Sequence, residues 1–254
     1  MRSFNLEELK RKVSLLSSTT TNTNPTDYVC PKCKDQEGEF YRDENGDEFW
    51  RDCECVIKKR VERLMMSSQI TDEFRKKGFK NFECEGKAEK VVQAFSCARD
   101  YAKEFQKNES TRVNSIALLG RPGCGKTHLL MAVSNNLISM GIEVTYFPWV
   151  EGFDDLKSDF TQLSEKINRL QRTRVLFIDD MFKGREEPTD FQIEKLFAIV
   201  NYRYLENKPI LVSSERTIAE MCGYDEAIGS RLNEMCGRFK VIIKGGIELN
   251  HRLR

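Results

Sequence analysis

The chain has 254 residues, which is long enough for one medium-sized domain and a small additional one. Charged residues make up 32% of it and the net charge is +1, so global charge favours neither a nucleic acid nor a membrane surface as a partner. The sequence contains neither the ~20 consecutive apolar residues that cross a bilayer nor an apolar signal core near Met1. We therefore expect a cytoplasmic protein without a membrane partner, whose nine cysteines bind metal or pack rather than form disulfides.

Residues 1–25 are predicted to form a short amphipathic helix followed by a flexible linker. Four apolar side chains recur at spacings of three and four within residues 5–16, at Leu6, Leu9, Val13 and Leu16. Residues 17–26 are rich in Ser, Thr and Asn, which is typical of a linker. A helix of about twelve residues is marginal alone, so its apolar stripe either packs on its own chain or binds a partner.

Residues 26–56 have the cysteine spacing of a zinc ribbon. The pairs Cys30/Cys33 and Cys53/Cys55 match the spacing of a tetrahedral site with four cysteine ligands. The Asn45-Gly46 turn predicts a hairpin whose strands are 39–41 and 49–51. A Zn²⁺ ion would replace the core that so few residues cannot build. A redox pair or unliganded cysteines are the alternatives.

Local charge changes sign after the ribbon. Residues 26–56 carry ten acidic and four basic side chains, which favours docking on a protein over binding a nucleic acid. Residues 57–80 carry eight basic and three acidic side chains. We interpret this second segment as a basic connecting helix, either solvated or in contact with nucleic acid.

A phosphate-binding loop follows. Residues 115–119 are predicted to be a buried strand and residues 128–139 a helix, which is the context that such a loop requires. Lys126 is expected to reach the β- and γ-phosphates and Thr127 to ligate Mg²⁺. The sequence therefore predicts a site for ATP or GTP. Its cofactor-binding residues are Gly120, Pro122, Gly123, Cys124, Gly125, Lys126, Thr127 and His128.

Cys124 lies within this loop at the start of the predicted helix. The partial positive charge of a helix N-terminus favours a thiolate. One hypothesis is that alkylation of this thiol blocks nucleotide binding, and the alternative is an inert filler residue. Full ATPase activity after stoichiometric labelling would contradict the first.

The second half of a nucleotide site is predicted at residues 174–180. This apolar run is typical of a strand in a parallel sheet that is covered on both faces. It ends in two carboxylates that would lie beside the loop. Asp179 is expected to hold Mg²⁺ through water, and Asp180 to polarise the attacking water.

Residues 81–254 alternate helices and strands. Helices are predicted at 87–106, 152–171, 190–206 and, as two short ones, within 218–235. Further strands are predicted at 142–147, 209–213 and 239–243. This order predicts an α/β P-loop NTPase domain with a doubly wound parallel sheet.

Together these features resemble the DnaC/DnaI-type replicative helicase loaders, which are AAA+ ATPases of bacteria and their phages. Transposition helper ATPases of the IstB type are close relatives. The resemblance covers nearly the whole chain. It rests on an ordered set of segments: 120–127, 179–180, 201–204, 213–215, 229–232 and 251–253. The N-terminal four-cysteine pattern is more similar to that of phage and Gram-positive loaders than to a transposition helper.

The resemblance implies roles for three further residues. In AAA+ assemblies an arginine of the neighbouring subunit senses the γ-phosphate, and Arg231 matches that finger. Sensor 1 usually carries Asn, whereas this chain has Ser214-Glu215, so Glu215 is either a second base or a repulsive group. Arg252 resembles a sensor 2 arginine. Because Asp180 stands where many AAA+ proteins have Glu, we expect a slow ATPase.

The function implied is that of an ATP-dependent helicase loader. Its N-terminal part would bind a hexameric replicative DNA helicase, while the ATPase domain self-associates and contacts single-stranded DNA. One alternative is an IstB-like transposition helper, which would bind duplex DNA and not need the ribbon. The other is a zinc-bearing nucleotide switch that hydrolyses ATP weakly, which Glu215 favours.

Overall fold

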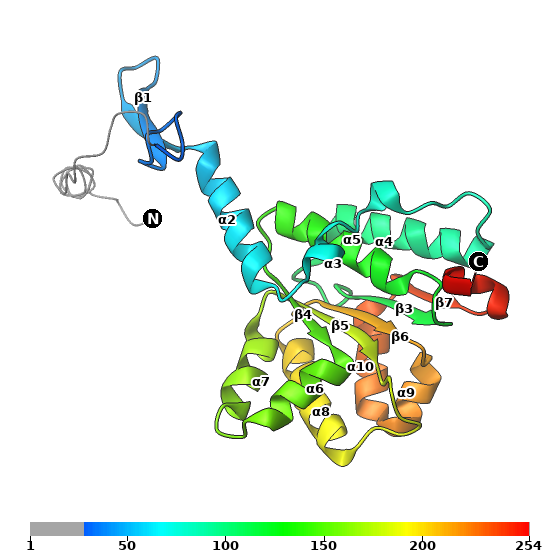
Figure 1. The fold of residues 1–254 in the computed structure, drawn as a ribbon. Coiled ribbons are helices and arrows are strands. Elements are labelled where there is room, and N and C mark those ends of the chain that lie inside the picture. The colour runs from blue at the N-terminus through cyan, green and yellow to red at the C-terminus, as the bar shows by residue number, and fades with distance from the viewer. Residues whose placement is uncertain (1–27, 254) are drawn as a thin grey trace. The chain divides into compact units, whose positions relative to one another are not determined.

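The computed structural model describes residues 28–253 (Figure 1). The helix and linker predicted within residues 1–25 therefore lie outside the described residues. Contacts divide the chain into two compact units, Met1–Lys59 and Arg60–Arg254. No helix of the described residues is long and apolar enough to cross a membrane.

The described part of the first unit is a hairpin followed by the start of a helix. Strands β1 (Gly38–Arg42) and β2 (Glu48–Asp52) pair antiparallel, which confirms the two predicted strands. Helix α2 (Glu54–Ser67) begins directly afterwards and contains the division between the units. A Cβ atom on Gly38 would lie 2.3 Å from the Trp50 ring, so only glycine fits beside this tryptophan.

The second unit is built on a parallel sheet whose strands follow the order β4-β5-β6-β3-β7. The strands are β3 (Ile116–Gly120), β4 (Val144–Pro148), β5 (Val175–Met181), β6 (Ile210–Ser214) and β7 (Lys240–Ile243). Each coincides with a predicted strand to within two residues. Both faces of the sheet are buried, and side chains of β3 alternate between two core clusters, Ile116 and Leu118 in one and Ala117 and Leu119 in the other.

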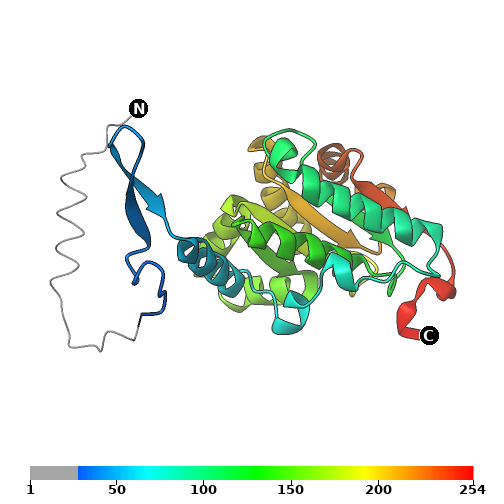
Figure 2. The same cartoon turned by 90° about the horizontal axis from the view of Figure 1, so that it is seen from above.

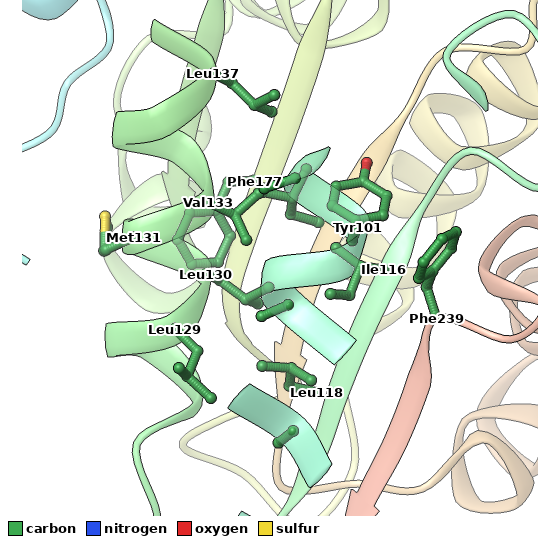
Figure 3. Packing of buried hydrophobic residues seen from close by; sticks show 14 of the residues in the cluster. Tyr101, Ile116, Leu118, Leu129, Leu130, Met131, Val133, Leu137, Phe177 and Phe239 are labelled. Carbon is green, nitrogen blue, oxygen red and sulfur yellow. The ribbon is translucent and has the colours of Figure 1, made fainter. Parts of the chain in front are cut away.

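Helices cover both faces of this sheet (Figures 1 and 2). One face carries α4 (Glu89–Asn108) and α5 (Lys126–Ser139). The other carries α6 (Trp149–Ser158), α7 (Leu163–Arg172), α8 (Asp190–Leu205), α9 (Ile218–Tyr224) and α10 (Glu226–Cys236). Figure 3 shows the first core, where Leu130 and Val133 of α5 and Tyr101 of α4 gather around Phe177 and Ile116. The predicted doubly wound α/β fold is confirmed.

The segment predicted to stretch as helix over 152–171 is two helices. Asp159 interrupts it, because its carboxylate accepts hydrogen bonds from the backbone N–H and the hydroxyl of Thr161. Such local side-chain bonds compete with the helical ladder.

The basic segment 57–80 is also more structured than a connecting helix. From Arg60 onward it belongs to the second unit, with α3 (Asp72–Arg75) and the 3-10 helix η1 (Phe79–Asn81) after α2. Its apolar residues Val61, Leu64, Met65 and Phe74 pack against the first core cluster. The Asn135 side chain of α5 also donates to the carbonyl oxygens of Phe74 and Lys77. The apolar side of α2 is therefore covered by the first core cluster of the second unit.

Arg203 of α8 is a buried cation without an acidic hydrogen-bonding partner among the described residues. Its side chain is 0% exposed and donates to five backbone oxygens, those of Leu170, Gln171, Thr173, Arg174 and Pro209. These carbonyls include the unpaired end of α7, where a helix dipole favours a positive charge. Arg203 therefore joins the end of α7 to the beginnings of β5 and β6.

We expect Arg203→Met to lower the free energy of unfolding by about 3–5 kcal/mol, because several buried carbonyls lose a charged donor together. Urea denaturation followed by circular dichroism measures this. Arg172→Met, which removes an exposed arginine from the same helix end, should change the free energy by less than about 0.5 kcal/mol. A loss below about 1 kcal/mol for Arg203→Met would contradict the structural role.

Candidate nucleotide-binding site and metal centre

The loop Gly120–Thr127 connects β3 to α5 at the carboxyl edge of the sheet. Gly120 has a φ of +115° and lies so close to the Ile243 carbonyl that a Cβ atom would approach its oxygen to 2.2 Å. Gly125 has a φ of +94°, and a Cβ atom there would lie 2.7 Å from the Phe82 ring. Both positions therefore require glycine. The loop can turn its backbone N–H groups inward at the beginning of α5, where an anion is favoured.

Lys126 is buried in this loop, with 5% of its surface exposed. Its ammonium group donates to the Gly120 and Arg121 carbonyl oxygens, both at 2.7 Å. Burial lowers the pKa of Lys126, whereas the nearby charges of Asp180 and Glu215 raise it. The cation is thus held at the loop by neutral acceptors and is available to an anionic ligand.

Asp179 lies beside Thr127 at the end of β5. Three hydroxyl groups donate to its carboxylate: Thr127 at 2.9 Å, Tyr146 at 3.0 Å, and Ser213. Burial raises the pKa of Asp179, and the hydrogen bonds from these hydroxyls oppose that shift. A carboxylate oxygen next to a threonine hydroxyl is a ligand pair that suits Mg²⁺.

Asp180 follows in a backbone conformation that is rare for a non-glycine residue, with a φ of +51°. The pairing of β5 with β6 is irregular at this point, between Ile178 and Met181. The Ser213 hydroxyl accepts a hydrogen bond from the Asp180 N–H at 2.8 Å. Ser213 therefore holds both members of the acidic pair.

These groups surround one cavity of about 580 Å³. Most of the predicted site residues line it: Pro122, Gly123, Gly125, Lys126, Thr127, His128, Asp179, Asp180, Glu215 and Arg252. Side chains that were not predicted line it as well, namely those of Phe74, Lys77, Tyr146, Trp149 and Lys183, among others. The volume and the mixture of cations and carboxylates suit a nucleotide with its metal ion.

The four cysteines of the predicted ribbon form a second constellation. All four sulfur atoms lie within 4.8 Å of one another, with Cys30 to Cys53 at 3.8 Å and Cys33 to Cys55 at 3.4 Å. Ligands about 2.3 Å from a tetrahedral Zn²⁺ are roughly 3.8 Å apart. The Asp35 carboxylate accepts hydrogen bonds from the Val29 and Cys30 N–H groups, which holds the turn that carries Cys30 and Cys33. The residues present therefore fit a tetrahedral thiolate-bound ion.

Comparison with known protein families shows to which family this chain belongs. The family model of the bacterial DnaA ATPase domain matches residues 74–236, which is more than half of the chain. This protein belongs to the bacterial DnaA-type ATPase family. The predicted similarity to DnaC/DnaI-type AAA+ proteins is confirmed at the level of family and fold. The parallel-sheet unit is accordingly a AAA+ ATPase domain.

Individual relatives agree with this assignment. The phage-like element PBSX protein XkdC of Bacillus subtilis is 48% identical over 98% of this chain and 95% of its own length. The replicative helicase loader DnaC of Escherichia coli is 27% identical over 64% of each chain. Among solved structures, DnaI has a TM-score of 0.57 with 19% identity, covering 70% of this chain and 93% of its own. That last likeness shows the fold alone.

The surroundings of three predicted residues of this AAA+ domain bear on their roles. Cys124 is fully buried and its thiol donates to the Arg121 carbonyl oxygen at 2.9 Å. Burial raises the pKa of Cys124, which opposes the thiolate that the helix N-terminus was expected to favour. Desolvation outweighs the helix N-terminus. Glu215 is paired with Lys183, and its role as a second base or a repulsive group stays a prediction. His128 contacts the Gly78 and Asn81 oxygens as well as the cavity.

Arg231 of α10 does not line the cavity. Its guanidinium carbon lies 5.3 Å from the Tyr204 ring centre and 5.5 Å from that of Phe197, and it donates to the Ala227 carbonyl oxygen at 2.9 Å. A residue that acts on a neighbour's nucleotide has no reason to line its own site. The role in trans stays a prediction.

Proposed function

We propose that this protein is an ATP-dependent helicase loader, which binds a hexameric replicative DNA helicase and helps to place it on single-stranded DNA. The observation that carries the proposal is a four-cysteine cluster joined in one chain to a DnaA-type ATPase domain. The relative DnaC is named a replicative helicase loader. The acidic charge of the ribbon supports a protein rather than DNA as its partner.

Within this proposal the cavity holds ATP and Mg²⁺. Lys126 and the loop amides bind the phosphates, and Thr127 and Asp179 hold the metal ion. Asp180 orients the attacking water, and Arg252 contacts the nucleotide from the C-terminal segment. Arg231 acts on the nucleotide of an adjacent copy, so that hydrolysis depends on self-association.

The ribbon holds Zn²⁺ through Cys30, Cys33, Cys53 and Cys55, and the ribbon with the residues before it docks on the helicase. Such thiols persist in the reducing cytoplasm, which is where a replication protein acts. Binding to single-stranded DNA is weak and sensitive to salt, because basic side chains provide it.

Co-elution with the replicative helicase of the same genetic context tests the proposal. We expect a stable complex, with and without ATP, that a Cys30→Ser/Cys33→Ser variant loses. Cys222→Ser, which removes a thiol outside the cluster, should retain it. A complex that is indifferent to Cys30 and Cys33 would move docking away from the ribbon, and no complex under any nucleotide condition would exclude a loader.

A weakly hydrolysing nucleotide switch is the second candidate. The observation in its favour is the ion pair between Lys183 and Glu215, which occupies the place where a neutral side chain usually orients water. Turnover below about one ATP per hour, with and without single-stranded DNA, would favour the switch, since typical enzymes turn over on the order of 10 times per second.

A further inference from the structure

Lys183, a lysine outside the predicted site, shares the nucleotide cavity with the phosphate-binding loop. Its ammonium group pairs with the carboxylate of Glu215 at the end of β6. Both side chains line the cavity together with Lys126 and Asp180. The ion pair therefore lies where the terminal phosphate of a bound nucleotide would meet the ends of β5 and β6.

The backbone after β5 brings Lys183 to this position. Asp180 and Phe182 have φ values of +51° and +65°, in the left-handed region that non-glycine residues rarely adopt. The Lys183 N–H donates to the Asp180 carbonyl oxygen at 2.9 Å, which closes a tight turn. Phe182 is buried, and its ring centre lies 4.9 Å from that of Trp149. Local strain that packing maintains is common at functional sites.

Two ammonium groups thus face one cavity from different elements. Burial lowers the pKa of Lys126, and the positive charge of Lys183 acts in the same direction, so the two cations lie within electrostatic range of each other. Lys126 donates to neutral carbonyl oxygens, and the side chain of Lys183 is still 40% exposed. A polyphosphate provides the negative charge that both cations attract.

We propose that Lys183 binds the γ-phosphate of ATP within its own chain and that Glu215 is its positioning residue. The inference rests on the proposed ATP site. Pairing with Lys183 also offsets the repulsion between the Glu215 carboxylate and the phosphate.

We expect Lys183→Met to weaken binding of the nonhydrolysable analogue β,γ-methylene-ATP by about 10–100-fold, the effect of losing a charged hydrogen bond. Binding of ADP, which lacks the γ-phosphate, should change by less than about 3-fold. Isothermal titration calorimetry with Mg²⁺ measures both affinities. Lys195→Met is the matched control, because Lys195 pairs with Glu194 at 2.6 Å and does not line the cavity.

A double variant separates phosphate binding from simple neutralisation of Glu215. In a Glu215→Gln background, Lys183→Met should still weaken binding of the analogue by about 10-fold or more. Equal affinities of Glu215→Gln with and without Lys183 would mean that the lysine only neutralises the carboxylate, which overturns the proposal. Equal losses for ADP and for the analogue would also overturn it. Wild-type protein that binds neither nucleotide would instead refute the ATP site itself.

Discussion

Removal of zinc is expected to unfold the hairpin of the first unit and leave the AAA+ domain folded. The two strands have five residues each, and their aromatic side chains Phe40, Tyr41 and Phe49 remain 38%, 41% and 44% exposed. A two-stranded hairpin is at best marginal alone. A structural zinc ion contributes roughly 10–16 kcal/mol in zinc-finger peptides, so we expect an ion in the four-cysteine cluster to decide whether the hairpin is folded.

Tryptophan fluorescence can report the hairpin separately. The chain has two tryptophans: Trp50, whose ring centre is 4.8 Å from that of Phe40, and Trp149, which is buried in the AAA+ domain. In a Trp149→Phe variant a strong chelator should shift the Trp50 emission to longer wavelength. Helical circular dichroism, which comes mostly from the AAA+ domain, should change little.

Metal analysis provides the control. We expect about one zinc ion per chain in the wild type and in Cys97→Ser, which changes a thiol outside the cluster, and a content near zero in Cys33→Ser. Unchanged Trp50 emission in metal-free protein would show that the hairpin folds without zinc.

The elements of the AAA+ domain could be predicted from the sequence because their signals are local. An apolar strand, a glycine-rich loop with Lys126 and Thr127, and an apolar helix follow one another directly, and the structure places β3 and α5 within two residues of expectation. Strand β5 was equally clear, because a sheet covered on both faces requires a continuous apolar run.

The rest of the site depends on contacts between distant segments. Tyr146 donates to Asp179 from the neighbouring strand β4, and Ser213 reaches the same carboxylate from β6. Register between parallel strands sets these contacts, and no short motif encodes register. Their positions in the sequence were the one usable signal: both residues lie near the carboxyl ends of strands, where ligand sites of parallel sheets are found. Similarly, the burial that governs Cys124 comes from tertiary packing.

Arg231→Ala is expected to lower the rate of ATP hydrolysis by about 10³-fold, the effect of removing an arginine finger. Its affinity for ATP should stay within about 3-fold of wild type, because Arg231 lies outside the cavity of its own chain. The side chain is already held against the Tyr204 and Phe197 rings, so little ordering is required when a second copy binds. Arg238→Ala removes an arginine paired with Glu104 on the surface and should retain full turnover.

Mixing two inactive variants tests whether Arg231 acts across the interface. Lys126→Met keeps Arg231 but should have a defective phosphate site, whereas Arg231→Ala should bind ATP but lacks the predicted finger. If the finger acts in trans, a mixture contains interfaces that join an intact site to an intact Arg231, and turnover rises well above that of either variant alone. A mixture as inactive as its components, under conditions in which both variants assemble, would place the action of Arg231 within its own chain.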